Sequence, residues 1–386
     1  MDIRNWLTEQ KKKDLLRQLT PVQRLPDGQL VVPGYTSCQL LDFSSNDYLG
    51  LSCHEKVIEQ SRHFLELAGC GAGSARLMSG DLAMYHLLEE EVAKLKDQEA
   101  ALLFGSGYMA NCGVIPALAG RNDVIFADRL NHASIYDGCS LSRAKIVRFH
   151  HNDINHLEEL LHKQRGTGEA LIVVESLYSM DGDRCPLQDL VQLKEKFNCL
   201  LMVDEAHATG LFGKNGGGII EEDGVASRVD VAMGTFGKAL GSYGAYIAAS
   251  KSMIDFLINR ARTFIYSTGL PPAVIGASLA ATRIIGQEPE LRRDLFAKVE
   301  CFKAALGEKG LTNLGPSQIV PIMIGESSRA VKIAHALRDQ GIFATAVRPP
   351  TVPEGTARLR FSITRHLSKE ALQQAASLVT AALDAM

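Results

Sequence analysis

The hydrophobic positions of the chain change their spacing at about residue 100 and again at about residue 271. Between these points, short apolar runs alternate with stretches that have apolar residues at helical spacing. The runs are Ala100–Phe104, Val124–Ala127, Ile146–Phe149, Ala170–Val174, Leu200–Val203 and Val229–Met233. Fully apolar strands separated by helices predict a mainly parallel sheet with helices on both faces. Ligands of such sheets bind at the carboxyl ends of the strands, so the residues directly after each run are candidates for chemistry.

The regions before and after this alternation have different patterns. Before it, the spacing predicts helices over 2–20, 54–67 and 82–95 and short β segments at 30–32 and 39–42. After Pro271-Pro272 it predicts a long helical region to about residue 309, strands at 319–324, 342–348 and 358–363, and helices near 328–340 and 368–384. We therefore expect an α/β protein with a smaller α+β domain at its C-terminus. The predicted segments are 1–42 (N-terminal helix and β segment), 43–280 (large domain) and 281–386 (small domain).

The composition fits an ordinary globular protein, with 46% hydrophobic and 22% charged residues. The net charge of -3 gives no reason to expect a nucleic acid or an anionic membrane as partner. The start lacks the apolar run of a signal peptide, and no apolar run approaches the ~18 residues of a membrane span, so we expect a cytoplasmic protein. We expect the scattered cysteines, which form no C-x-x-C motif, to be reduced and mostly buried; they are at positions 38, 53, 70, 112, 139, 185, 199 and 301.

A glycine-rich loop follows the first apolar run. The segment Gly105–Ala110 fits G-x-G-x-x-A between a strand and a helix. Such a loop can be part of a dinucleotide site, or more generally a helix N-terminus whose free amides bind a phosphate. A tight turn that needs glycine is the plain structural alternative. About 100 residues of other structure precede this unit, which argues against a Rossmann domain.

Histidines and acids follow the middle runs. His132 can stack on an aromatic ligand or transfer protons, or it can simply cap a helix. Asp204 directly follows an apolar strand, where an acid is costly to bury unless it meets a cation, and His207 lies in the same loop. His150, His151, Asp153 and His156 form a loose cluster. We expect no metal there, because Asn152-Asp153 reads as a helix N-cap on a polar surface.

Lys238 follows the last run, within the Gly-rich segment Thr235–Gly244. Desolvation at a strand end favours a neutral amine, which can form a Schiff base with an aldehyde. Taken alone, Lys238 is better explained as an exposed loop lysine, as most lysines and arginines of a chain are. Together the strand ends offer an amine, a buried acid, an imidazole and a phosphate cradle. These are the groups that pyridoxal phosphate requires, because its aldehyde needs an amine and its ring nitrogen a carboxylate.

On these residues the chain resembles the fold-type I pyridoxal-phosphate enzymes, specifically the α-oxoamine synthases, which join an amino acid to an acyl thioester with loss of CO₂. The resemblance covers nearly the whole chain and implies a mainly parallel seven-stranded sheet, pyridoxal phosphate as cofactor and a homodimer. The matching motifs are Ser44–Leu51, Ser179–Asp183, Val203–Gly210 and Thr235–Lys238. The segment Val347–Arg360, with its run Arg348–Thr351, resembles the branch that joins L-alanine to a pimeloyl thioester, on CoA or on a carrier protein.

The resemblance also implies roles for single residues. As catalytic residues, Lys238 binds the aldehyde and moves the substrate proton, Asp204 pairs with the ring nitrogen, and His132 stacks on the ring. Further cofactor contacts fall on Gly107, Tyr108, Glu175, Ser179, His207, Thr235, Ser267 and Thr268, of which Ser267 and Thr268 match a segment that reaches the phosphate of the other subunit. Substrate contacts fall on Arg17, Asn46, His132, Arg348, Thr351 and Arg360.

Several alternatives stay open at this point. The nearest is a sister synthase such as glycine C-acetyltransferase or 5-aminolevulinate synthase. A nucleotide-dependent oxidoreductase built on the loop Gly105–Gly107 belongs to another class. A serine hydrolase is disfavoured because no G-x-S-x-G occurs. Within the family, Ser74-Ala75 stands where many members have Gly-Gly, and Tyr243 where a smaller or aliphatic residue is common, which leaves the acyl-chain preference open.

Overall fold

The computed structural model describes residues 2–33, 39–312 and 314–385, which form two compact units. The larger unit consists of Leu51–Ser179 and Arg184–Arg292. The smaller unit consists of Met1–Gly50, Met180–Asp183 and Arg293–Met386. The bounds differ from the predicted segments 1–42, 43–280 and 281–386, which remain a prediction about domains.

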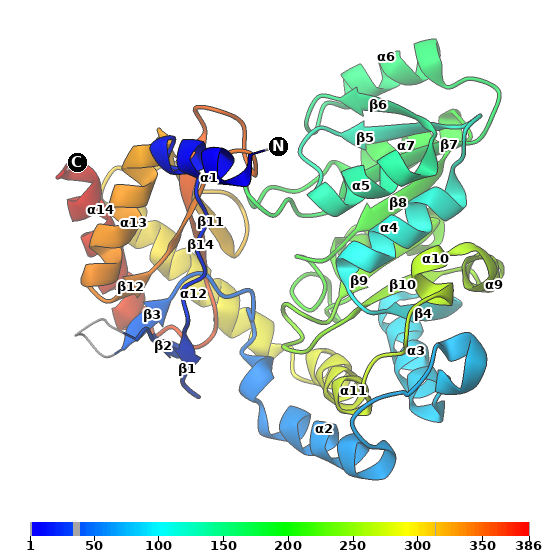
Figure 1. Ribbon diagram of the computed structural model, residues 1–386, viewed down its shortest axis with the longest axis horizontal. Coiled ribbons are helices and arrows are strands. Elements are labelled where there is room, and N and C mark those ends of the chain that lie inside the picture. The colour runs from blue at the N-terminus through cyan, green and yellow to red at the C-terminus, as the bar shows by residue number, and fades with distance from the viewer. Residues whose placement is uncertain (1, 34–38, 313, 386) are drawn as a thin grey trace. The chain divides into compact units, whose positions relative to one another are not determined.

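The larger unit is built on a seven-stranded sheet in the order β4-β10-β9-β8-β7-β5-β6 (Figure 1). Its strands are β4 (Ala100–Phe104), β5 (Val124–Asp128), β6 (Lys145–Phe149), β7 (Ala170–Glu175), β8 (Leu200–Asp204), β9 (Val231–Thr235) and β10 (Ala245–Ala249). Strand β10 is antiparallel to both neighbours, β4 and β9. The pairs β5–β6, β5–β7, β7–β8 and β8–β9 are parallel. The predicted mainly parallel seven-stranded sheet is therefore confirmed.

Helices cover both faces of the sheet and bury most of its strands on both sides, while the edge strand β6 is partly exposed. On one face α4 (Gly107–Leu118), α5 (Ala133–Ser142), α9 (Lys251–Arg260) and α10 (Arg262–Ile265) share one apolar cluster with the strands. On the other face Lys96, at the end of α3 (Ala83–Lys96), lies 5.9 Å from the ring of Tyr246 in β10. The remaining elements of this unit are η1 (Leu51–Cys53), α2 (Glu55–Ala68), η2 (Arg76–Gly80), α6 (Ile154–Gln164), α7 (Leu187–Lys196), α8 (Ile219–Glu222), η3 (Ala226–Arg228) and α11 (Pro272–Gln287).

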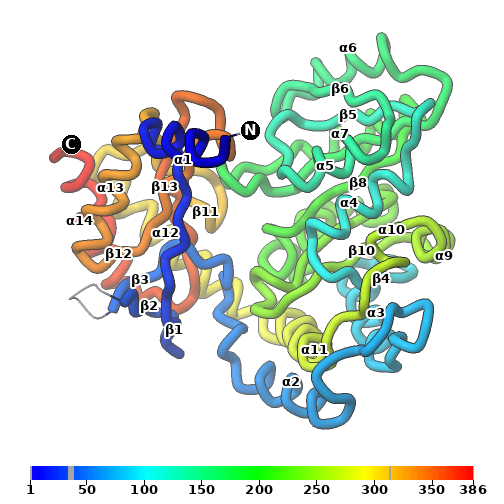
Figure 2. Tube along the Cα trace, viewed as in Figure 1, coloured from blue at the N-terminus to red at the C-terminus, as the bar shows by residue number. Residues whose placement is uncertain are grey.

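The smaller unit combines the N-terminal segment with the C-terminal part of the chain. One sheet has the order β1-β2-β3-β12 and the other β11-β14-β13. The strands are β1 (Gln23–Arg24), β2 (Gln29–Val31), β3 (Leu40–Asp42), β11 (Ile319–Gly325), β12 (Ile342–Phe343), β13 (Thr345–Val347) and β14 (Ala357–Ser362). Its helices are α1 (Ile3–Lys12), α12 (Glu290–Gly307), α13 (Ser327–Asp339) and α14 (Lys369–Asp384). Figure 2 shows the N-terminal segment, in dark blue, running beside β13, and the parallel pair β3–β12 joins the two parts.

Three predicted elements have different bounds in the structure, each for a local reason. The helix expected over 2–20 ends at Lys12, because Asp14 has a φ of 55°, which no helix contains. The helical region after residue 271 is two helices, since Pro289 lacks the N–H that would continue the first. The strand expected at 342–348 is two short strands in different sheets, with Ala344 between them.

Two expectations from composition can also be compared with the structure. Within 2–33, 39–312 and 314–385, no helix combines the length and apolar character needed to cross a membrane. The cysteines of these ranges are free, but only Cys139, Cys185 and Cys199 are buried, so the expectation that most are buried is wrong for them. Cys38 lies outside the described residues.

Candidate active site

Lys238 lies on a closed loop between β9 and β10. Thr235, the last residue of β9, donates its hydroxyl to the carbonyl of Gly244 over 2.8 Å, and the amide of Phe236 donates to the same carbonyl over 3.0 Å. The amide of Ser242 donates back to the carbonyl of Phe236 over 2.8 Å. These bonds fix the ends of the loop, so the position of the Lys238 backbone follows from the register of the two strands.

One glycine makes this loop possible. Gly241 has a φ of +61°, and a Cβ atom there would lie 2.2 Å from the backbone nitrogen of Ser52. Any side chain would therefore be strained twice, by its conformation and by the close approach of a second backbone. This is a physical reason for the glycine-rich sequence around Lys238.

The Lys238 amine lies beside a histidine from the loop that follows the neighbouring strand, β8. Its Nζ atom lies 2.9 Å from Nε2 of His207, which is buried in the loop after β8. Lys238 itself is half-buried rather than fully enclosed. The structure thus brings together the amine and the imidazole that the sequence placed on separate strand ends.

Two carboxylates end adjacent strands. Asp204 closes β8 and Glu175 closes β7, and the two residues are direct partners in the parallel ladder. Asp204 is 5% and Glu175 3% exposed. Burial, and then the nearby Asp204 carboxylate, raise the pKa of Glu175 to about 8. Glu175 therefore keeps its proton at neutral pH, next to the carboxyl group of Asp204.

His132 caps the N-terminus of α5, after β5. Its backbone amide donates to Oε1 of Glu175 over 2.5 Å, and its imidazole Nδ1 accepts from the amide of Ser134 over 3.2 Å. Burial lowers the pKa of His132, so the ring is neutral over a wider pH range than usual. The capping role that the sequence allowed is observed, and it leaves the other edge of the ring for a ligand.

The N-terminus of α4 presents free amides. Ser106 caps the helix by accepting from the amide of Met109 over 3.2 Å, and the first intrahelical bond runs from Ala110 to Ser106. The amides of Gly107 and Tyr108 precede that bond, which is the arrangement that binds phosphate. The Tyr108 ring lies 6.5 Å from that of His132, at 84°.

Three further residues of the predicted cofactor set have different surroundings. Ser179 is buried, and its backbone amide donates to Glu175. Ser267 and Thr268 line a small cavity together with Gly105, which lies just before α4. Thr268 also forms an isolated β-bridge with Ala75.

In the smaller unit, two of the predicted substrate residues are in direct contact. Arg360 of β14 donates from Nη2 to Oδ1 of Asn46 over 3.2 Å and from Nη1 to the hydroxyl of Ser362 over 2.6 Å. Tyr48, fully buried, donates to the same Oδ1 over 3.1 Å. A buried guanidinium held in this way can bind a carboxylate through its planar donors.

Three other predicted substrate residues, Arg17, Arg348 and Thr351, also lie together. Nη2 of Arg17 donates to the hydroxyl of Thr351 over 3.0 Å. Arg348 donates to the backbone carbonyl of Asp14. Burial, and then the nearby positive charge of Arg17, lower the pKa of Arg348. Two guanidinium groups close enough to influence each other favour an anionic partner between or beside them.

Asn111 and Ser134 were missed by the sequence reasoning. Nδ2 of Asn111, in α4, donates over 3.0 Å to both Oδ2 of Asp204 and the hydroxyl of Ser134. The only sequence signal was a lone amide in an otherwise apolar helical segment, which must find partners if it is buried. Which partners it finds depends on the packing of α4 against the sheet.

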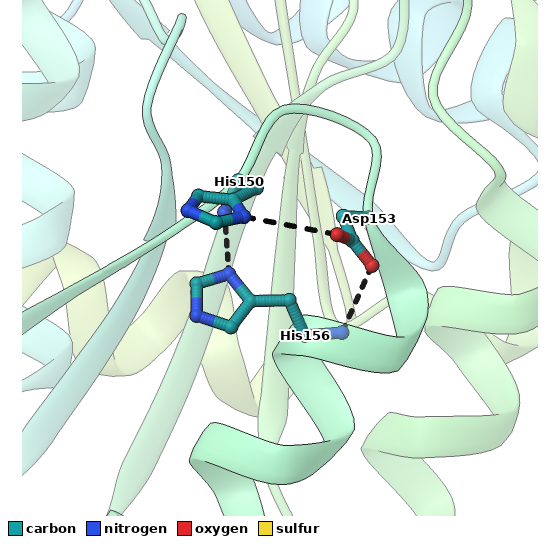
Figure 3. Close-up of side chains that lie close together, drawn as sticks. All are labelled: His150, Asp153 and His156. Atoms are coloured by element: carbon teal, nitrogen blue, oxygen red, sulfur yellow. Dashed lines mark hydrogen bonds and ion pairs between the residues drawn. The ribbon is translucent and has the colours of Figure 1, made fainter.

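The cluster His150, Asp153 and His156 is also assembled by the fold (Figure 3). One ligand-type atom from each residue lies within 4.8 Å of the others. However, Oδ1 of Asp153 caps α6 by accepting from the amide of His156 over 2.9 Å, as the sequence predicted. Nδ1 of His156 accepts from the amide of His150 over 2.9 Å, so an ion at that atom would have to displace this hydrogen bond. We assign no metal to this cluster.

The residues of the larger unit fit pyridoxal phosphate. The amine of Lys238, the buried Asp204 and the free amides of Gly107 and Tyr108 all follow carboxyl ends of strands. The strands β4, β5, β7, β8 and β9 run in the same direction, so these ends lie at one edge of the sheet. The donor set supplies an amine, a carboxylate and phosphate-binding amides, which are the partners the cofactor needs.

Comparisons with known proteins agree with this geometry. The sequence model of the family described as aminotransferase class I and II matches residues 39–379. The chain is 47% identical to the 8-amino-7-oxononanoate synthase of Geobacter sulfurreducens, over 92% of this chain and 91% of that protein. It is also 47% identical to the enzyme of the same name from Geotalea daltonii, over 95% and 93%. A serine palmitoyltransferase from S. paucimobilis, solved with a bound PLP–myriocin aldimine, superposes with a TM-score of 0.92 at 28% identity, covering 99% of this chain and 97% of that one.

Proposed function

Because the chain belongs to the aminotransferase class I and II family, and within it to the pyridoxal-phosphate-dependent α-oxoamine synthases, we propose that it makes 8-amino-7-oxononanoate. The substrates are L-alanine and a pimeloyl thioester, and the other products are CO₂ and the free thiol. The reaction belongs to biotin biosynthesis. With the family established, the alternative of a nucleotide-dependent oxidoreductase is set aside.

Pyridoxal phosphate supplies an aldehyde that binds an amine and a ring that withdraws electrons from the substrate carbon. Around it the chain's own residues position and move protons. Asp204 would hold the ring nitrogen, His132 would cover one ring face, and the amides of Gly107 and Tyr108 would bind the phosphate. Nζ of Lys238 takes the proton from Cα of alanine and later returns one, and His207, 2.9 Å away, orients that amine.

Each of the remaining assigned residues has a proposed role. Glu175 and Ser179 fix the backbone beside His132. Thr235, Ser267 and Thr268 act on the phosphate side, with Ser267 and Thr268 contributed to the other subunit of a homodimer. Asn46 and Arg360 bind the alanine carboxylate.

The observation that carries the substrate assignment is the group Arg17, Arg348 and Thr351. A pimeloyl chain ends in a second carboxylate, unlike an acetyl group, and two arginines next to a hydroxyl suit such an end. A succinyl chain also ends in a carboxylate but is shorter. Glycine C-acetyltransferase and 5-aminolevulinate synthase chemistry are therefore the alternatives to test.

The test is a competition between acyl thioesters. The full-length enzyme with pyridoxal phosphate is given alanine and an equimolar panel of acetyl-, succinyl-, pimeloyl- and long-chain acyl-CoA, and the products are identified by mass spectrometry. We expect the pimeloyl product to dominate. A clear preference for acetyl- or succinyl-CoA would replace the proposal with the corresponding sister activity.

Two arginine variants separate the two substrate sites. Arg348→Ala should raise the KM for the pimeloyl thioester about tenfold or more, with little change for alanine, because one charge-assisted contact is lost. Arg360→Lys should do the reverse, raising the KM for alanine, since lysine lacks the planar pair of donors. If both variants changed the same KM, the two assignments would be wrong.

A further inference from the structure

A buried hydrogen-bond network joins His132 to Asp204 through two residues that have no assigned role. The hydroxyl of Ser134 lies 2.8 Å from Nδ1 of His132. Nδ2 of Asn111 lies 3.0 Å from that hydroxyl and 3.0 Å from Oδ2 of Asp204. Asn111 is 0% and Ser134 1% exposed, so water does not compete for these groups.

The direction of each hydrogen bond follows from what each group can donate. An ionised Asp204 only accepts, so the Asn111 amide must present its NH₂ group to it, and the second hydrogen of that group points to the Ser134 oxygen. The Ser134 hydroxyl accepts from Asn111 and is left to donate its own hydrogen to Nδ1 of His132. The reverse amide orientation would place an oxygen against the carboxylate.

A second donor reaches the same imidazole nitrogen. The backbone amide of Ser134 donates to Nδ1 of His132 over 3.2 Å, as the cap of α5. A backbone N–H cannot reverse its role, so Nδ1 must carry a lone pair and no hydrogen. In the neutral ring, which burial favours by lowering the pKa of His132, the hydrogen is then on Nε2.

The network is held in place by close packing of two helices. A Cβ atom on Gly138, in α5, would lie 2.6 Å from the backbone oxygen of Asn111, in α4. The two backbones touch at this glycine, which brings the side chains of Asn111 and Ser134 within hydrogen-bond distance. On the other side, the second oxygen of Asp204 accepts from the amide of Ala206 over 2.9 Å. Both oxygens of the carboxylate are thus oriented by the chain.

We propose that Asn111 and Ser134 are positioning residues that fix His132 as the Nε2–H tautomer and couple its orientation to that of Asp204. His132 then presents a hydrogen-bond donor to the ligand, which suits an oxygen acceptor such as a substrate carboxylate or the carbonyl oxygen of an acyl thioester. This assignment rests on the proposed function for the nature of the ligand. The tautomer itself depends only on residues of the larger unit.

The tautomer is measured directly by NMR of the histidine ring nitrogens. The full-length protein, labelled with ¹⁵N-histidine, is recorded at about pH 8, where an ordinary histidine is neutral, with and without pyridoxal phosphate. The His132 signals are identified by their loss in His132→Asn. We expect a protonated Nε2 and an unprotonated Nδ1 in both forms. A protonated Nδ1 in the wild-type protein overturns the proposal without any variant, and it would leave the proposed function untouched.

Variants test the two positioning residues. Ser134→Ala removes one of two donors to Nδ1. The backbone amide of the cap remains, so we expect the same tautomer with a shifted Nδ1 signal, and a drop in kcat of about tenfold, the effect of one hydrogen bond. Ser134→Thr keeps the hydroxyl and should restore the wild-type signal. Ser140→Ala is the matched control, because it removes a hydroxyl from the same helix, one that donates to the carbonyl of Tyr136 over 2.9 Å. Unchanged His132 signals in Ser134→Ala would refute the role of Ser134.

Asn111→Asp tests the link to Asp204 with almost no change in shape. It replaces the donating NH₂ group with an oxygen that faces the Asp204 carboxylate, so we expect weaker retention of pyridoxal phosphate in dialysis and an altered His132 spectrum. Retention and spectrum both equal to wild type would show that the coupling is absent. If Asn111→Asp does not fold, the variants Ser134→Ala and Ser134→Thr and the wild-type spectrum still decide the proposal.

Discussion

Replacing Lys96 with methionine should destabilise the larger unit strongly. Lys96 and Glu205 form an ion pair in which both side chains are 0% exposed. Lys96 also donates to the carbonyl of Gly217, and Oε1 of Glu205 accepts from the amide of Ile220 over 3.0 Å. Methionine keeps the length and apolar stem of lysine, so the change removes mainly the charge and leaves the Glu205 carboxylate buried without its cation.

The magnitude follows from that uncompensated charge. Breaking a buried ion pair by removing one partner costs about 3–5 kcal/mol, whereas removing both partners can be nearly neutral. We therefore expect Lys96→Met to lower the free energy of unfolding by about 3–5 kcal/mol. The double variant Lys96→Met/Glu205→Gln should recover a large part of the loss, because glutamine keeps the acceptor for Ile220 without the charge.

The assay is urea unfolding followed by fluorescence and circular dichroism, with pyridoxal phosphate at one fixed concentration. The matched control is Lys163→Met, which breaks the exposed pair with Glu159 on α6 and should change the unfolding midpoint little. A loss below about 1 kcal/mol for Lys96→Met, or a double variant no more stable than the single one, would refute the reasoning. Because Glu205 follows Asp204 in the chain, Lys96→Met should also weaken cofactor retention.

The remaining predictions concern the site and its loop. Lys238→Ala should abolish turnover and the absorbance of the lysine-bound cofactor, with Lys163→Ala as control; full activity in Lys238→Ala would end the assignment. In the cofactor-free protein, the pKa of Glu175 is raised from 4.5 to about 8, so its contribution to stability is present below pH 4.5 and is lost as the pH rises to about 8. Glu175→Gln should reduce this loss of unfolding free energy with rising pH, measured by unfolding curves at several pH values. If the free energy of unfolding depended on pH in the variant as it does in the wild type, Glu175 would titrate normally. Gly241→Ala should lower the melting temperature more than Gly224→Ala. Both glycines have a positive φ, which costs alanine about 1–2 kcal/mol in either position. A Cβ atom on Gly241 would in addition lie 2.2 Å from a backbone atom, whereas Gly224 has open space. Equal shifts for the two glycine variants would argue against the close approach of Ser52.

The apolar runs predicted most of the central sheet. Runs such as Ala100–Phe104 and Ala170–Val174 became strands almost as expected, because a strand buried on both faces must be apolar throughout. Strand β10 (Ala245–Ala249) was not predicted. It is short, alanine-rich and antiparallel, and its pairing between β4 and β9 stabilises it more than its own sequence does.

The boundaries of the smaller unit show the limits of local patterns. The pairing of β3 with β12 joins residues about three hundred positions apart, and no local spacing encodes such a partner. Similarly, no local pattern predicted that Arg17 contacts Thr351, and the resemblance implied only that each contacts the substrate.

The sequence by itself determined which chemical groups are available and where on strands they lie. Lys238, Asp204, His132 and the amides at Gly107 follow apolar runs, and parallel strands place their carboxyl ends at one edge, so the amine, the acid and the phosphate cradle could be predicted together. Only the tertiary structure decided which of these groups are in contact and which other residues link them. The pairing of Lys238 with His207, the raised pKa of Glu175 beside Asp204, and the links through Asn111 and Ser134 depend on the order of strands and on the packing of α4 against α5. Hydrogen bonds and pKa shifts act over a few ångströms, and the distances between residues far apart in sequence are set by the fold alone.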